Sequence, residues 1–142
     1  MTEMRFSVPG VPVAWARART RDGRHFTAPK VKAWKDRVLT CALAAGVTPL
    51  RGPLHVSILA YWPCVGAPRK KTPRPRRYKT SRPDADNIAK GVCDALNGQA
   101  WADDAQVALL TVCKMHAAQG EPPRTEIAIA SRPALPDATE MT

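Results

Sequence analysis

Hydrophobic and polar positions alternate along several stretches of the chain. Residues 53–62 alternate from Leu54 to Trp62, which is the period-two pattern of a half-buried strand. Residues 106–116 and 124–131 are two further strand-like runs, joined by the turn-rich sequence AQGEPP. We therefore expect these two runs to pair as an antiparallel hairpin.

The N-terminal region predicts an edge strand followed by a short hairpin. Residues 5–16 mix β-branched and aromatic side chains with two prolines and a glycine, a pattern typical of an edge strand interrupted by a bulge. Asp22-Gly23 then stands between short alternating flanks and indicates a two-residue hairpin turn. This ribbon would project four arginines: Arg17, Arg19, Arg21 and Arg24.

Two segments follow the helical period. Apolar residues recur at that period over Pro29–Ala45, and a glycine stands at the expected C-cap. A second amphipathic helix is predicted to begin near Asp86 and to end at Asn97-Gly98. Gly91 lies inside this second pattern and costs about 1 kcal/mol relative to alanine. It therefore indicates close packing, with a dimer partner as one candidate neighbour.

These elements predict one small α+β domain, with a mixed or antiparallel sheet and two main helices. The 142 residues suit a single domain, and no repeat or composition shift marks a second one. We assign residues 1–131 to the domain and 132–142 to a flexible C-terminal tail. No apolar run approaches the ~18 residues of a membrane span, and the N-terminus lacks an apolar signal core. A cytoplasmic location away from membranes is the default expectation.

The charge balance makes nucleic acid the leading partner. Lysine and arginine total 22 against 12 acidic residues, a formal net charge of +10. Such a field attracts polyanions and favours phosphate contacts. A ribosome-associated protein, a binder of anionic membranes and a basic homologue of a neutral fold remain alternatives at this stage.

Four cysteines are scattered along the chain without a C-x-x-C pair or histidines at metal spacing. Neither a zinc site nor a disulfide framework is indicated. We expect reduced thiols.

Residues 63–83 form a proline-rich basic segment. This composition indicates a mobile loop that neither joins a sheet nor buries a face, and that becomes ordered on a phosphate backbone. Tyr78 is available there to stack on a base. A solvated linker without a role is the alternative. The candidate DNA-binding cations of this segment are Arg69, Lys70, Lys71, Arg74, Arg76, Arg77, Lys79 and Arg82.

Directly behind this basic segment, Asp84 and Asp86 stand two residues apart. In an extended segment both side chains point to one side, and Asp86 lies one helical turn before Lys90. The three residues would then form one cluster. The same residues also fit an ordinary helix start, with an aspartate cap and an i,i+4 ion pair.

A second acidic pair, Asp103-Asp104, precedes the strand-like run that begins at residue 106, and Asp94 lies one turn past Lys90. Acids therefore concentrate between residues 84 and 104, beside the densest positive charge. Mg²⁺ prefers carboxylate and water oxygens, and phosphodiester cleavage commonly uses a carboxylate-held metal ion. This combination favours metal-dependent nuclease chemistry over simple binding.

The sequences PDADNIAKGVCDALNG and WADDAQV resemble those of the RusA-like Holliday junction resolvases, which are crossover junction endodeoxyribonucleases of bacteria and their phages. The shared pattern is D-x-D-N, a lysine four residues after the second aspartate, D-A-L, and an acidic pair followed by Q-V. The segment VPGVPVAWARARTRDGRHFTAPKVKAWKDRV is also similar to the family's opening strand, basic hairpin and first helix. The resemblance extends to about residue 131.

The resemblance implies a small α+β fold, an obligate homodimer and Mg²⁺-dependent symmetric nicking of four-way DNA junctions, with Mn²⁺ as an alternative ion. It further implies that Asp84, Asp86 and Asp104 are the metal-binding catalytic acids, with Asp103 as an additional candidate ligand. Lys90 corresponds to the family's essential lysine. The chain departs from the family pattern in the proline-rich segment and in the tail.

The sequence thus predicts a structure-selective endonuclease that acts in DNA recombination and repair. A noncatalytic basic nucleic-acid-binding module is the main rival hypothesis. A metal nuclease that acts on flaps or single strands is a third, and these residues do not separate it from the first.

Overall fold

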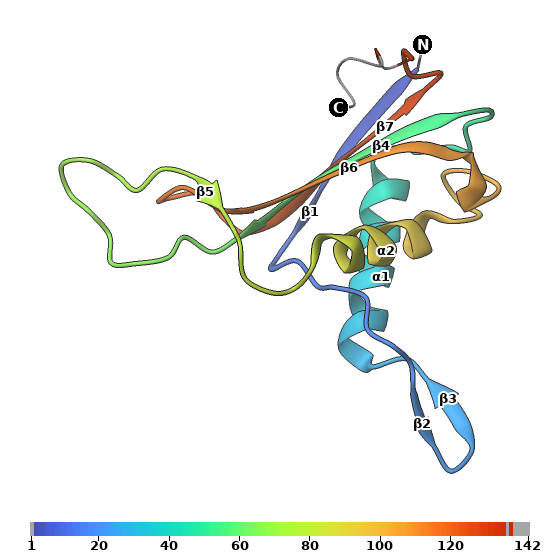
Figure 1. Cartoon of the computed structure of the whole chain (residues 1–142), viewed down its shortest axis with the longest axis horizontal. Helices are drawn as coiled ribbons and strands as arrows, with labels where there is room; N and C mark the ends of the chain where they lie inside the picture. Colours follow the sequence, from blue (N-terminus) through green and yellow to red (C-terminus); the bar gives the residue numbers. More distant parts are fainter. Residues whose placement is uncertain (1, 136, 138–142) are drawn as a thin grey trace.

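Within the residues that the computed structural model describes, 2–135 and 137, a five-stranded mixed sheet carries two helices against one of its faces (Figure 1). In their order across the sheet, the strands are β1 (Glu3–Pro9), β7 (Arg124–Ser131), β4 (Leu54–Trp62), β6 (Val107–His116) and β5 (Arg77–Tyr78). The remaining elements are the β2 (Arg19–Arg21) and β3 (Arg24–Phe26) hairpin, the helices α1 (Pro29–Ala44) and α2 (Ala85–Leu96), and the short 3-10 helix η1 (Asp104–Gln106). The predicted single α+β domain is confirmed.

The core lies between the sheet and the two helices. Alternation along β4 directs Leu54, Val56 and Ile58 toward the helices, and all three side chains are fully buried. They belong to one hydrophobic cluster with residues of α1 and α2, such as Val38 and Val92. No helix in the described part of the chain is long and apolar enough to cross a membrane.

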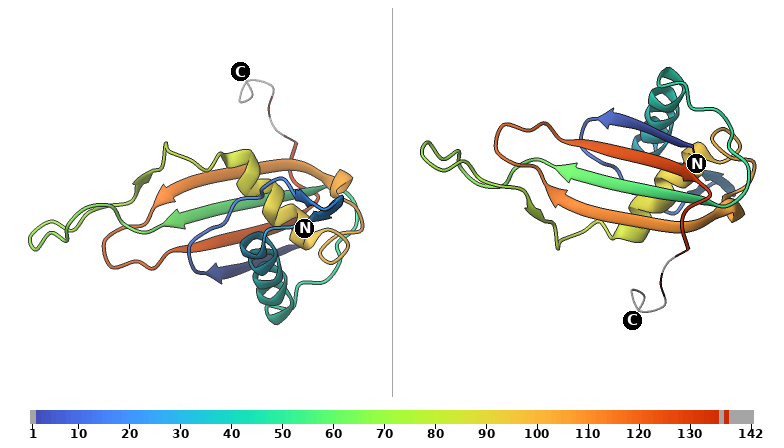
Figure 2. Two further views of the ribbon diagram at one scale, coloured as in Figure 1. Left: turned by 90° about the horizontal axis from the view of Figure 1, so that it is seen from below. Right: turned by 90° about the horizontal axis from the view of Figure 1, so that it is seen from above.

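The other face of the sheet has no helix over it in the described residues (Figure 2). Polar side chains from neighbouring strands meet there. The Nε2 atom of His55 lies 3.1 Å from the Ser57 hydroxyl and 3.2 Å from the Thr111 hydroxyl. The sheet is therefore one-sided, with an apolar face toward the helices and a mixed polar face left open.

The predicted β6–β7 hairpin is wrong, although both strands exist. β4 lies between them, antiparallel to β7 and parallel to β6. The central place suits β4, because the strand is largely buried and its backbone N–H and C=O groups need hydrogen-bond partners along both edges. The parallel β4–β6 pair follows from the chain path, since α2 makes the crossover between these strands.

The N-terminal strand lies at the sheet edge as predicted, but it is shorter than expected. β1 pairs with β7 alone and ends at Pro9, whereas residues 10–16 form no strand. Gly10 has a φ of +103°, and Pro12 has no N–H group for a ladder, so the strand stops there. The β2–β3 turn is confirmed, with positive φ values of 52° at Asp22 and 75° at Gly23.

The basic segment 63–83, called the basic arm below, projects from the body as a long excursion between β4 and α2 (Figure 1). The expectation that it joins no sheet is wrong at one point. Arg77 and Tyr78 form β5 and pair with His116 and Met115 of β6. Proline and basic residues do not prevent this pairing, because β5 is a two-residue edge strand. Of the expected C-terminal tail, residues 136 and 138–142 lie outside the described residues.

Candidate active site

The first acidic pair lies at the N-terminal end of α2. Asp84 occupies the N-cap position, but its side chain makes no capping hydrogen bond. Asp86 lies in the first turn, and its Oδ1 accepts a hydrogen bond from the backbone N–H of Asn87 at 3.0 Å. Both aspartates are exposed. A capping role thus does not account for the Asp84 carboxylate, which faces solvent at the start of the helix.

Lys90 does not pair with Asp86 as the sequence suggested. Its Nζ lies 3.5 Å from Oδ1 of Asp94, one turn further along α2. The same ammonium lies over the ring of Trp15, 5.0 Å from the ring centroid. A cation is attracted to the face of an indole, so Trp15 favours this position of the lysine over one near Asp86. Trp15 was not identified as a site residue from the sequence.

The segment that carries Trp15 crosses α2 at Gly91. The backbone N–H of Trp15 donates to the carbonyl oxygen of Asn87 at 2.9 Å. A Cβ atom at Gly91 would lie 3.4 Å from the Trp15 nitrogen and 3.7 Å from the carbonyl oxygen of Val13. The close packing predicted at Gly91 is therefore present, and its neighbour is a segment of the same chain.

We expect two substitutions at Gly91 to have opposite effects. Gly91→Ala places its Cβ at ordinary contact distance and gains about 1 kcal/mol of helix propensity, so the melting temperature should stay level or rise. Gly91→Val adds methyl groups against the crossing backbone and should lower stability by roughly 1–3 kcal/mol. Thermal unfolding of the two variants checks this, and an alanine variant as unstable as the valine variant would contradict the packing argument.

The second acidic pair lies at the start of η1, with Asp103 at the N-cap and Asp104 as the first residue, and the two carboxylates make different contacts. Oδ1 of Asp104 accepts a hydrogen bond from the indole Nε1 of the fully buried Trp101 at 2.8 Å, which fixes the orientation of that carboxylate. Asp103 caps η1 instead. Its Oδ1 accepts from the backbone N–H of Ala105 at 2.9 Å, and Gln106 completes the capping box. The Asp103 carboxylate therefore has a structural role as the cap of η1.

Cys93 marks the place where α2 and η1 approach one another. Burial, followed by the nearby carboxylates of Asp104 and Asp94, raises the pKa of the Cys93 thiol to about 12. The carboxylates of Asp104 and Asp94 therefore lie near enough to Cys93 to act on its thiol, whereas Asp84 and Asp86 lie at the start of α2. All four cysteines are free, as predicted.

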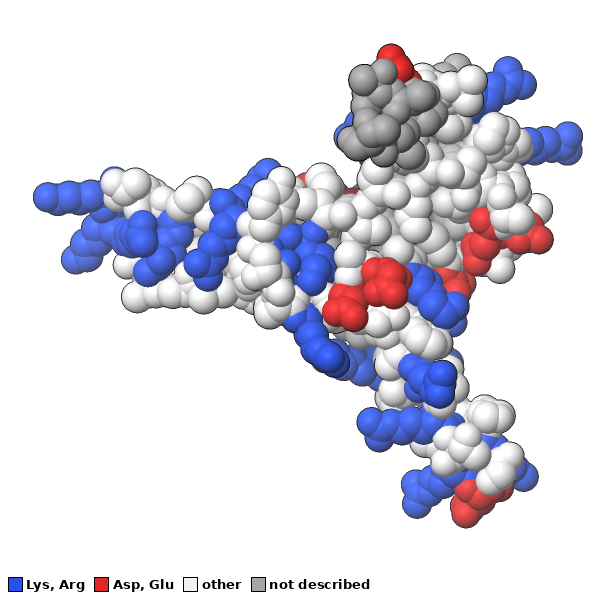
Figure 3. Space-filling model, in the orientation of Figure 1, with Lys and Arg blue, Asp and Glu red and all other residues white. Residues whose placement is uncertain are grey.

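The donor types fit a hard divalent cation, because the candidate ligands are carboxylates without competing histidines. In the described part of the chain, no three His, Cys, Asp or Glu side chains form a group that could hold a metal ion as they stand. The acids are distributed along one surface that follows α2 and η1. Figure 3 shows one group of acidic side chains between two strongly basic projections, the basic arm and the β2–β3 hairpin, and a second acidic group on the side of the body away from the arm.

The predicted DNA-binding cations fall into two groups. Most are exposed and have no ion pair or side-chain hydrogen bond among the described residues: Arg17, Arg19, Arg21, Arg24, Arg69, Lys70, Lys71, Arg77 and Arg82. The other three have internal partners. Arg74 donates to the carbonyl oxygen of Ala67, Arg76 pairs with Glu121, and Lys79 donates to the Ser81 hydroxyl.

Lys114 is a further residue that sequence reasoning missed. It extends from β6, and its Nζ donates to the carbonyl oxygens of Ser81 at 2.9 Å and Pro83 at 2.7 Å. These bonds tie the segment immediately before Asp84 to the sheet. A signal was present, because Lys114 follows Val112 at the helix-facing register of the strand, where an apolar residue is expected.

Comparison with known proteins places this arrangement in a family. Residues 9–130 match the family described as "Endodeoxyribonuclease RusA". The chain is also 36% identical over 137 residues to YqaN of Bacillus subtilis (strain 168), which is described as an uncharacterized protein. That similarity covers 89% of this chain and 94% of the relative. The family match includes both acidic pairs, Lys90 and the two basic projections. The chain therefore belongs to the RusA family of endodeoxyribonucleases.

Proposed function

We propose that this protein is a metal-dependent, structure-selective endonuclease that resolves four-way (Holliday) DNA junctions by paired nicks during recombination and repair. The observation that carries the proposal is the acidic surface of α2 and η1, whose acids at the start of α2 lie between two basic projections (Figure 3). Cations on both sides suit a phosphate backbone, and carboxylates between them suit a metal ion at the scissile phosphate. Membership of a nuclease family supports the same reaction class.

In this proposal Asp84, Asp86 and Asp104 hold Mg²⁺, or Mn²⁺ in its place. RusA nucleases are generally dependent on divalent metal ions. When bound, such an ion activates water and stabilises the departing oxygen. Other side chains of the protein orient the proposed metal ligands. Trp101 donates a hydrogen bond to the Asp104 carboxylate, and Lys114 donates to the backbone of the segment before Asp84.

Lys90 has a separate role in this proposal. Trp15 and Asp94 hold its ammonium at the exposed surface of α2, on the same helix as the first acidic pair. A fixed cation at this position stabilises the negative charge that develops on the phosphate during cleavage. The Asp94 carboxylate keeps the ammonium in place until a phosphate competes for it.

We also propose that the active form is a homodimer, because resolution of a junction needs matched incisions in two like strands. The open face of the sheet is the surface we assign to the second copy. It presents apolar Leu59, 37% exposed, beside the polar group of His55, Ser57 and Thr111. A mixed surface of this kind suits self-association.

A supercoiled plasmid with an extruded cruciform tests paired incision directly. Two nicks within one binding event give a linear product, whereas a single nick relaxes the plasmid and removes the cruciform. We expect linear DNA as the main early product, together with a sedimenting species of two protein chains on DNA. Nicked circles alone, or a stable monomer on DNA, would reject the paired mechanism.

The rival function is a noncatalytic basic binding module. The capping role of Asp103 favours it, since one of the five acids between residues 84 and 104 is explained by the local fold alone. This rival predicts salt-sensitive DNA binding that is indifferent to metal ions. Cleavage that stops in EDTA separates the two functions.

A further inference from the structure

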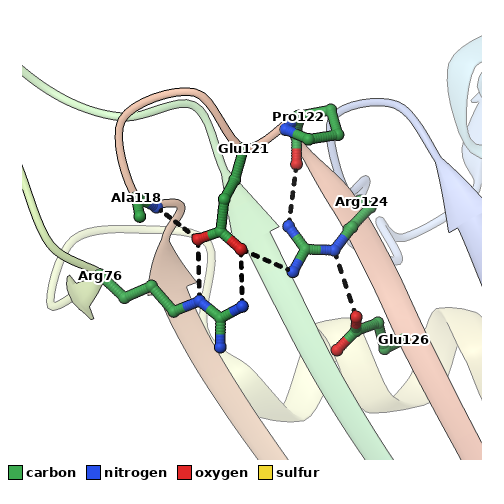
Figure 4. A network of polar contacts seen from close by, with 6 residues as sticks. All are labelled: Arg76, Ala118, Glu121, Pro122, Arg124 and Glu126. Carbon is green, nitrogen blue, oxygen red and sulfur yellow. Dashed lines mark hydrogen bonds and ion pairs between the residues drawn. The ribbon is translucent and has the colours of Figure 1, made fainter. Parts of the chain in front are cut away.

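The basic arm is attached to the β6–β7 connection by one carboxylate. The guanidinium of Arg76 donates to Glu121 through Nε at 2.8 Å and Nη2 at 2.6 Å (Figure 4). Glu121 also accepts from the backbone N–H of Ala118 at 2.9 Å and from Arg124 at 3.2 Å. The hydrogen bonds from Arg76, followed by the bond from the Ala118 N–H group, lower the pKa of Glu121 to about 2. The Glu121 carboxylate, the anchor of the arm, is therefore charged at neutral pH.

The same anchor is fixed to the sheet. Tyr61 of β4 is almost fully buried. The guanidinium groups of Arg124 and Arg76 lie over its ring, 4.0 Å and 5.0 Å from the ring centroid. Arg124 is held in turn by Glu126 and the carbonyl oxygen of Pro122 (Figure 4). The base of the arm thus rests on a buried aromatic ring as well as on ion pairs.

Further from the sheet, the side chain of Gln119 joins the two halves of the arm by hydrogen bonds. Its Oε1 accepts from the backbone N–H groups of Arg69 at 3.0 Å and Arg74 at 3.1 Å, and its Nε2 donates to the carbonyl oxygen of Arg69 at 3.0 Å. The backbone N–H of Gln119 donates to the carbonyl oxygen of Arg74 at 2.9 Å. One side chain therefore ties the outgoing and returning halves of the arm to each other and to the β6–β7 connection.

These contacts leave the outer cations free. Gln119 holds the backbone of Arg69 and Arg74, and Lys70 and Lys71 lie between these two points. The side chains of Arg69, Lys70 and Lys71 are exposed without partners among the described residues. By contrast, Arg74 donates to Ala67 inside the arm, and Arg76 pairs with Glu121 of the β6–β7 connection. Some cations of the arm therefore have structural partners, whereas the outer group of Arg69, Lys70 and Lys71 projects from it.

We infer that the basic arm is a pre-organised phosphate-binding arm, positioned by Gln119 and Glu121, whose outer cations contact the backbone of one duplex arm of a branched DNA. The inference rests on the proposed function for its DNA partner. An arm that is ordered before binding avoids the entropy loss of ordering on DNA and holds its charges at a fixed angle to the acidic surface. Gln119 and Glu121 are positioning residues, because they act through the arm.

Limited trypsin digestion without DNA tests the positioning step. Trypsin cleaves after lysine and arginine in locally unfolded segments, and both the arm and the β2–β3 hairpin supply such sites. Glu121→Gln and Gln119→Ala should each raise the arm's cleavage rate about tenfold, as expected for the loss of hydrogen bonds that hold it. Cleavage in the hairpin is the internal control for an intact fold. Glu126→Gln is the matched variant, since it removes the same charge but leaves Arg76 paired with Glu121.

Junction binding by the same variants tests the DNA step. Glu121→Gln makes the protein more positive, so electrostatics alone predicts tighter binding, whereas the inference predicts binding about fivefold weaker or more. Lys70→Ala with Lys71→Ala should weaken binding without faster trypsin cleavage at the lysine and arginine sites that remain in the arm. Unchanged arm cleavage or tighter binding of Glu121→Gln would overturn the inference. If the wild-type arm resists trypsin but the protein binds no branched DNA, the proposed function fails and the DNA role of the arm fails with it.

Discussion

Asp86→Asn is expected to reduce junction cleavage by roughly 100-fold or more while junction binding stays as tight as in the wild type or becomes tighter. The substitution removes a proposed metal ligand, so the chemical step is lost. It also removes an exposed negative charge from the surface that faces the phosphates. The side chain keeps its size, and its Oδ1 can still accept the hydrogen bond from the Asn87 N–H group.

Single-turnover cleavage of a labelled four-way junction, measured beside the dissociation constant, separates these two effects. Asp36→Asn is the control, because Asp36 is an exposed aspartate on α1 and the charge change is identical. Its cleavage rate should match that of the wild type. Nicking at the wild-type rate by Asp86→Asn would reject the assignment of the metal site.

Lys90→Ala should lower the rate of the chemical step by roughly 10²–10³-fold, with a much smaller loss of junction affinity. The ammonium lies on the acidic surface, held between the Trp15 ring and Asp94, rather than on either basic projection. Its expected contribution is therefore to the transition state more than to the grip on DNA. Cleavage rates at saturating protein measure the first quantity, and a binding titration in EDTA measures the second.

The chain supplies a close structural control for this lysine. Lys32 on α1 forms the same i,i+4 ion pair with an aspartate, at 3.4 Å from Asp36 compared with 3.5 Å for Lys90 and Asp94. Lys32→Ala removes an equivalent charge and ion pair, and it should leave the cleavage rate unchanged. If Lys90→Ala loses binding while its bound complexes cleave at the normal rate, Lys90 is a phosphate anchor.

Local patterns predicted the elements of this fold well, and the pairing of the strands less well. The helices, β4 and the Asp22-Gly23 turn depend on periodicity and on backbone preferences within a few residues. The separation of β6 from β7 depends on β4, which lies far before both strands along the chain, with α2 between. Adjacent strand-like runs favour a hairpin, and only the buried surface of β4 overrides that preference.

The site shows a similar division between local and distant information. The spacing of Asp84 and Asp86 at a helix start was readable from the sequence, whereas the pairing of Lys90 with Asp94 depends on Trp15, which lies far away along the chain. The role of Arg76 also depends on a remote partner, Glu121 in the β6–β7 connection. A run of cations does not reveal which members are used inside the fold.

The most direct test of the account is incubation of the wild-type protein with a mobile four-way DNA junction and with a linear duplex of matching sequence, each in Mg²⁺ and in EDTA. We predict paired nicks in the junction alone, present in Mg²⁺ and absent in EDTA. Tight binding to the junction without any metal-dependent nick would contradict the account. The acids of α2 would then be part of a basic DNA-binding surface, with no catalytic role.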